Sequence, residues 1–115
     1  MKNVVVEKSV KVALLIIQYC ELLDAHKKYV IAKQLLKSGT SVGANIHEAQ
    51  NAESKADFIH KIKIATKELE ETKYWLLLCK KSESYPAPSG LETKVKELGL
   101  ILYKILSTSI KSRKH

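Results

Sequence analysis

The sequence contains few of the residues that interrupt helices. Its 115 residues include only four Gly and two Pro, and both prolines lie in one segment, 82–89. So few interruptions favour long elements of secondary structure. Cysteine is equally scarce: Cys20 and Cys79 form no CxxC or Cys/His spacing that would indicate a metal site. We expect both to be buried, free thiols.

The sequence also gives no indication of a targeting segment or of a membrane-spanning segment. Only Lys2 precedes the first valines, and Glu7 and Lys8 follow them, which does not match a signal peptide. The longest apolar run, Val12–Ile17, is too short to span a bilayer. We therefore expect a soluble cytoplasmic protein without a membrane partner, folded as a single domain over residues 1–115.

Catalytic motifs are missing as well. The four histidines are scattered, and none lies three or four residues from another. The chain has no Gly-rich phosphate loop, no nucleophile motif and no Glu-x-x-His pair of the kind that di-metal helical bundles use. The prediction is a protein that is not an enzyme, with no catalytic residue, no cofactor and no metal.

What the sequence does contain is a long helical pattern from Ser54 to Lys81. No Gly or Pro interrupts this segment, and Ser54 followed by Asp57 resembles a capping box at its start. An apolar stripe of this period predicts a helix that needs partners to be stable. The stripe recurs at alternating spacings of four and three: Phe58, Ile62, Ala65, Leu69, Thr72, Leu76 and Cys79.

Three further segments carry stripes of the same period. Helices are expected over 3–24, over 29–50, and from a capping-box pattern at Ser89 and Glu92 onward, with a frayed basic tail from Lys111. Short links between them force neighbours to be antiparallel, so we predict an all-α, up-down-up-down four-helix bundle. The three stripes are Val6, Ser9, Ala13, Ile16, Cys20 and Leu23; Ala32, Leu35, Gly39, Val42, Ile46 and Ala49; and Leu91, Val95, Leu98, Leu102, Ile105 and Ser109.

The segment 3–24 is apolar around most of its circumference, because Val12, Leu14, Ile17 and Tyr19 all lie off its stripe. Such a helix has either a wide intramolecular core face or a second contact surface. In so short a chain we favour the second and expect a homo-oligomer, with Leu14 and Ile17 in the interface.

The segment 29–50 has two unusual features. Gly39 and Gly43 each cost about 1 kcal/mol of helix propensity relative to Ala, which indicates either close approach of a neighbouring helix or a break near 38–40. Beside its apolar stripe runs a polar one that includes Ser41, Asn45 and Glu48. These side chains need hydrogen-bond partners, which a structural network or a ligand could supply.

The chain is basic, with a formal net charge of +8 concentrated in residues 54–115. This charge indicates either a solvated surface or contacts to the phosphates of RNA or DNA. Tyr74 is expected to point outward, to stack on a base or to pack on another subunit, whereas the adjacent Trp75 is expected in the core. The candidate nucleic-acid contacts are Lys33, Lys37, Lys63, Lys67, Lys111, Arg113 and Lys114.

Residues 35–79 resemble a bacterial four-helix-bundle family, the S23 ribosomal proteins or 23S rRNA intervening-sequence proteins. The matching features are the run 38–41, the run Val42-Gly43-Ala44-Asn45-Ile46 with Glu48 and Ala49, the start 54–58 and the run 71–75. Family members with the variant S-I-P-x-N-I-A-E-G have Pro in place of Gly43 and Gly in place of Ala49. This chain therefore resembles the Gly-Ala-Asn-Ile subgroup.

The resemblance implies an antiparallel bundle that assembles into homopentamers, and no catalytic residues. The family is similar to the accessory variability determinant protein of diversity-generating retroelements, a basic pentamer that binds nucleic acid and a reverse transcriptase. We expect a non-enzymatic oligomeric helical scaffold that binds RNA or DNA phosphates through its basic surface. The alternative is a homo-oligomeric assembly module for a protein partner, with incidental charge.

Overall fold

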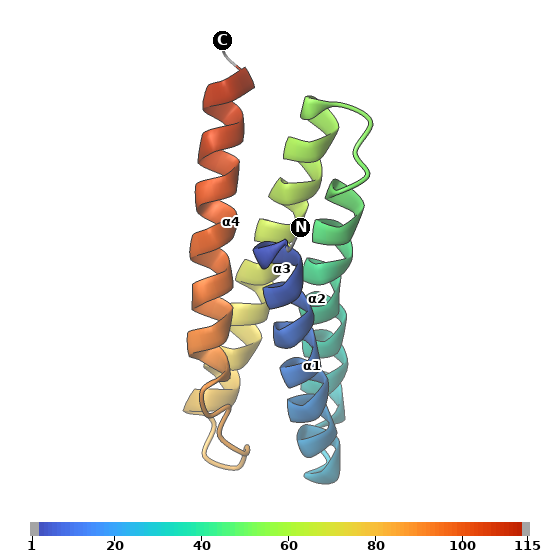
Figure 1. Cartoon of the computed structure of the whole chain (residues 1–115). Coiled ribbons are helices and arrows are strands. Elements are labelled where there is room, and N and C mark those ends of the chain that lie inside the picture. The colour runs from blue at the N-terminus through green and yellow to red at the C-terminus, as the bar shows by residue number, and fades with distance from the viewer. Residues whose placement is uncertain (1–2, 114–115) are drawn as a thin grey trace.

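Four antiparallel helices form the fold, as expected (Figure 1). The computed structural model describes residues 3–113, except for the side chain of residue 113. The elements are α1 (Val4–Ala25), α2 (Tyr29–Ala49), α3 (Lys55–Lys81) and α4 (Leu91–Arg113). Within the described part of the chain, each helix packs against its two neighbours, whereas the diagonal pairs α1/α3 and α2/α4 do not pack together. The prediction of an all-α four-helix bundle is confirmed.

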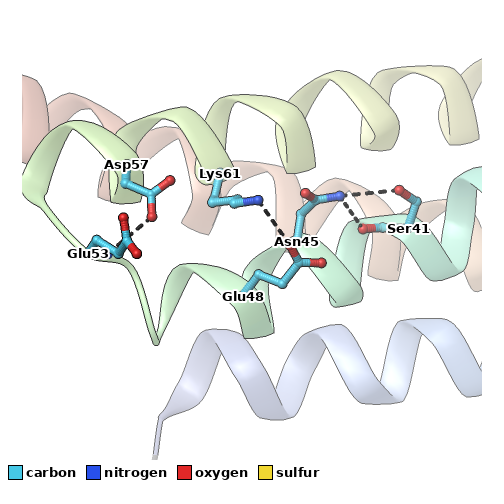
Figure 2. A network of polar contacts seen from close by, with 6 residues as sticks. All are labelled: Ser41, Asn45, Glu48, Glu53, Asp57 and Lys61. Atoms are coloured by element: carbon cyan, nitrogen blue, oxygen red, sulfur yellow. Dashed lines mark hydrogen bonds and ion pairs between the residues drawn. The ribbon is translucent and has the colours of Figure 1, made fainter.

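Helix α3 begins at the predicted cap. The Ser54 hydroxyl accepts a hydrogen bond from the backbone N–H of Asp57 at 3.0 Å. The Asp57 carboxylate accepts one from the backbone N–H of Glu53 at 3.1 Å (Figure 2). The first bond satisfies an N–H group that the first turn of a helix leaves without an intrahelical partner, and the second holds the residue that precedes the cap. Six of the seven residues of its predicted stripe are buried and Phe58 is half-buried.

Helix α2 is continuous, so the alternative of a break near residues 38–40 is wrong. All six residues of its predicted stripe are buried. A Cβ atom placed on Gly39 would lie 2.5 Å from Cδ1 of Ile16 on α1, so glycine is needed there for the two helices to approach closely. At Gly43 the nearest atom is Oγ of Ser9 at 3.5 Å, an ordinary contact that requires no glycine.

Helix α1 buries four of the six residues of its predicted stripe (Ser9, Ile16, Cys20 and Leu23), but its buried face is shifted from the predicted one. Val12 and Tyr19, expected off the stripe, are buried, whereas Val6 and Ala13 are only half-buried. Because α1 is apolar on nearly all sides, tertiary contacts decide which side turns inward. One such contact is the Tyr19 hydroxyl, which donates a hydrogen bond to the Pro86 carbonyl oxygen at 2.6 Å.

Helix α4 begins at Leu91, one residue later than a cap at Ser89 predicts. Gly90 has φ +75°, in the left-handed region, and therefore cannot be the first helical residue. Lys8 and Lys11 of α1 line a shared hollow with Lys94 and Glu97, in the first two turns of α4. Because the two helices are antiparallel, the start of α1, one turn before Lys8, lies near the middle of α4. Figure 1 shows the same stagger: α1 flanks only the first half of α4, and the second half extends past the start of α1 beside α3.

Candidate functional site

The predicted nucleic-acid contacts are exposed lysines on three helices. Lys33 and Lys37 lie on the outer face of α2, Lys63 and Lys67 on that of α3, and Lys111 near the end of α4. None of these five forms an ion pair with another described residue. The side chain of Arg113 and all of Lys114 lie outside the described part of the chain.

These lysines do not form one compact patch. A hydrogen bond between Thr72 and Ser38 and an ion pair between Lys61 and Glu48 set the register of α3 against α2. In this register the pair on α2 and the pair on α3 are separated by about 15 Å along the bundle axis, from a rise of about 1.5 Å per residue. A bound polyanion would have to be long enough to span both pairs.

The polar stripe of α2 is held by contacts within the bundle (Figure 2). Asn45 donates from Nδ2 to the Ser41 carbonyl oxygen at 2.9 Å and to the Ser41 hydroxyl at 3.3 Å. Glu48 accepts from Nζ of Lys61 on α3 at 3.0 Å, and this carboxylate raises the pKa of Lys61. These contacts favour the structural-network interpretation of Ser41, Asn45 and Glu48 over a ligand site.

The predicted interface residues of α1 are exposed. Leu14 is 53% exposed and Ile17 is 38% exposed, and Val10 continues the same side of the helix. Val10 and Leu14 line a shallow hollow of about 200 Å³ with Thr40 and Ala44 of α2. An apolar surface that runs over two helices is typical of a surface that contacts another protein.

Tyr74 lies on a different side of the molecule. It is exposed on α3, and its ring packs edge-on against Trp75 with 5.3 Å between the ring centroids. Trp75 itself is half-buried, and its indole N–H donates to the Glu71 carboxylate at 3.2 Å. Because α1 and α3 are diagonal in the bundle, Tyr74 cannot belong to the same patch as Leu14 and Ile17.

The buried titratable groups provide no reactive nucleophile. Cys20 and Cys79 are buried free thiols, as expected. Burial raises the pKa of Cys20 to about 12, with a smaller contribution from Asp24, and burial also raises the pKa of Cys79. Burial and then a hydrogen bond with Cys79 raise the pKa of Tyr19. All three groups are therefore neutral near pH 7, and thiols that stay protonated are poor nucleophiles.

Residues 3–113 contain neither a cluster of metal-ligating side chains nor a membrane-spanning helix. No three His, Cys, Asp or Glu side chains in this range come together as metal ligands. None of its helices combines the length and the hydropathy that crossing a membrane requires.

Sequence reasoning missed two exposed side chains on α4. Tyr103 is 69% exposed and Leu100 is 63% exposed, and Lys96 and Lys104 are exposed beside them. A signal was present in the sequence, because no acidic residue occurs from Leu98 to Ser112.

Comparison with known proteins identifies the family. Residues 1–104 match the family model of the 23S rRNA-intervening sequence protein. The chain belongs to this family. No curated protein matches the chain, and the family relationship assigns no enzymatic activity.

A solved structure supports the assignment to the 23S rRNA-intervening sequence proteins. The chain is similar to a protein of unknown function from the S23 ribosomal protein family of Bacteroides thetaiotaomicron VPI-5482. The two share 40% sequence identity and superpose with a TM-score of 0.84, over 89% of this chain and 97% of the other. The resemblance noted from the sequence covered residues 35–79, and the comparisons show that the family and the fold cover nearly the whole chain.

Proposed function

We propose that this protein is a non-enzymatic homo-oligomeric scaffold, a pentamer by family resemblance, that binds the phosphates of RNA or DNA through its basic surface. The observation that carries the proposal is the set of exposed lysines on α2, α3 and α4 that form no ion pair among residues 3–113. Lysines without an acidic partner are free to replace the counterions of a polyanion.

The apolar patch of α1 supports the oligomeric part of the proposal. Leu14 and Ile17 are exposed on α1, and Tyr74 is exposed on the diagonally opposite α3. If both surfaces contact sister copies, each contact joins two different patches. Contacts of this head-to-tail kind close into rings when the rotation between subunits allows it, rather than into two-fold dimers.

An assembly module for a protein partner is the second candidate. The hollow between α1 and α2, lined by Val10, Leu14, Thr40 and Ala44, favours it because this surface is apolar rather than charged. In that case the positive charge would serve solubility alone.

Binding to a generic RNA hairpin separates the two candidates. We expect the wild-type protein to bind a fluorescein-labelled hairpin at 50 mM salt, with an affinity that falls steeply as salt is raised toward 200 mM, because phosphate contacts release counterions. Fluorescence anisotropy measures both quantities, and a neutral peptide nucleic acid of the same sequence is the control. If the protein binds neither the hairpin nor a single-stranded oligonucleotide even at 50 mM salt, the nucleic-acid function is wrong and the assembly module remains.

A further inference from the structure

The outer face of α4 combines lysines with exposed apolar and aromatic side chains. Lys96, Leu100, Tyr103 and Lys111 recur at helical spacing on this face, and all four are exposed. We call this set the α4 face. The second half of helix α4 extends past the start of α1, so no part of α1 covers this half of the α4 face (Figure 1).

Tyr103 lies on the edge of this face that borders α3. It is one turn beyond Gly99, where an added Cβ would lie 3.1 Å from Leu69 and 3.7 Å from Nζ of Lys73. Because the two helices are antiparallel, one further turn along α4 leads back along α3 to the level of Lys67. Lys67, on the outer face of α3, therefore lies at about the level of Tyr103, and Lys63 lies one turn nearer the start of α3; both are exposed.

The acidic side chains near this surface have partners: Glu71, one turn from Lys67, accepts a hydrogen bond from the Trp75 indole N–H at 3.2 Å, and three others form ion pairs. Glu70 lies 3.4 Å from Lys73, Glu92 lies 3.9 Å from Lys80, and Glu97 lies 3.8 Å from Lys94. In contrast, Lys63, Lys67, Lys96, Lys104 and Lys111 form no ion pair within the described chain. The surface thus keeps an excess of positive charge around an exposed aromatic ring.

We propose that the α4 face, together with Lys63 and Lys67, binds single-stranded nucleic acid, with the Tyr103 ring stacking on a base. This inference rests on the proposed nucleic-acid function and narrows it to one surface and one class of ligand. Exposed aromatic rings flanked by lysines are the features that bind single strands without strong sequence preference. A duplex offers phosphates to the lysines but keeps its bases stacked and out of reach of the ring.

The position of Tyr103 makes the ring available for stacking. Its side chain is 69% exposed, whereas Tyr19 is buried and bonded to the Pro86 carbonyl oxygen. Tyr74 is exposed too, but the Trp75 ring packs against it and occupies part of the space beside the Tyr74 ring. Tyr103 therefore provides an aromatic surface next to unpaired lysines of two helices.

Substitution of Tyr103 tests the inference. We expect Tyr103→Ala in the full chain to weaken binding of a labelled 15-nucleotide oligouridylate or oligoadenylate by about 5- to 150-fold, as loss of one stacked base predicts. Binding of a duplex of equal length should change little. Tyr103→Phe should restore single-strand affinity, since it keeps the ring. The matched control is Tyr29→Ala, which removes a comparably exposed tyrosine from α2.

A pair of lysine variants tests the placement of the strand. Lys63→Ala with Lys67→Ala should lower the salt dependence of single-strand binding by about 0.7 for each phosphate contact removed. Lys8→Ala with Lys11→Ala, a pair three residues apart on α1 that belongs to neither set of candidate contacts, should leave that slope nearly unchanged. Circular dichroism and light scattering of each variant establish that fold and mass are retained.

Several results would overturn the inference, and one of them would also overturn the proposed function. Undiminished single-strand binding by Tyr103→Ala, with salt-sensitive binding intact, would overturn the inference alone. A smaller mass for Tyr103→Ala would make the residue a subunit contact instead. Tyr103-dependent binding to anionic phosphatidylserine vesicles without binding to oligonucleotides would make the surface a membrane contact. Failure of the wild-type protein to bind any nucleic acid at low salt would overturn the proposed function itself.

Discussion

Gly39 and Gly43 occupy similar positions in α2 but have different packing roles. Gly39 lies directly against the fully buried side chain of Ile16, whereas Gly43 has ordinary contacts with Ser9. We expect Gly39→Ala to lower the free energy of unfolding by about 1–3 kcal/mol through overpacking. Gly43→Ala should raise it by up to about 1 kcal/mol through helix propensity. Urea denaturation measures both, and equal effects of the two substitutions would contradict the packing argument.

Ser38 and Thr72 show how the core accommodates polar side chains. Both are fully buried, and the Thr72 hydroxyl donates to the Ser38 hydroxyl at 2.9 Å. Ser38 in turn donates to the Leu35 carbonyl oxygen at 3.4 Å. Buried hydroxyls that all find partners cost little, and the bond links α2 to α3 at a single register.

At the scale of the element, the start of α3 depends on one side chain. Ser54 accepts from the Asp57 N–H, and its removal leaves that N–H without a protein partner. We expect Ser54→Ala to lower the free energy of unfolding by about 1 kcal/mol. Ser84→Ala, in the loop before α4, is the control, since its hydroxyl only accepts a 3.4 Å contact from Lys28. Thermal unfolding followed by circular dichroism compares the two, and equal melting temperatures would show that the cap contributes nothing.

The elements also show what the sequence could and could not predict. The stripes of α2 and α3 and most of that of α4 were predicted correctly, because polar residues clearly mark their outer sides. The stripe of α1 was predicted correctly at four of six positions; Val12 is buried in preference to Ala13, and pattern alone cannot choose between them because both are apolar. The sequence led to no prediction for Tyr103: the absence of acidic residues indicates a basic surface on this part of α4, but the exposure of the ring is seen only in the packing of α4 on α3.

At the scale of the whole molecule, the α1 surface predicts how copies assemble. We expect Leu14→Lys or Ile17→Lys to yield smaller species by light scattering, because a charge placed in a buried interface opposes association. Helicity should be retained, since both side chains are exposed in the single chain. Val30→Lys is the matched control: Val30 is 77% exposed on α2 and lies outside the patch. An unchanged mass for all three variants would mean that α1 does not form the interface.

The stagger between α1 and α4 makes the two ends of the molecule unequal in thickness. Near Lys94, helix α4 has α1 as a neighbour. Near Thr108, α1 is no longer beside α4, and the neighbouring helix is α3. There Lys55 of α3 donates a hydrogen bond to the Ser112 hydroxyl of α4 at 3.2 Å. A helix supported on fewer sides opens at a lower free energy than one enclosed in a core. Local unfolding should therefore begin in the last turns of α4. Any molecule that binds to these turns would stabilise the end of the bundle at which α4 has fewer neighbours.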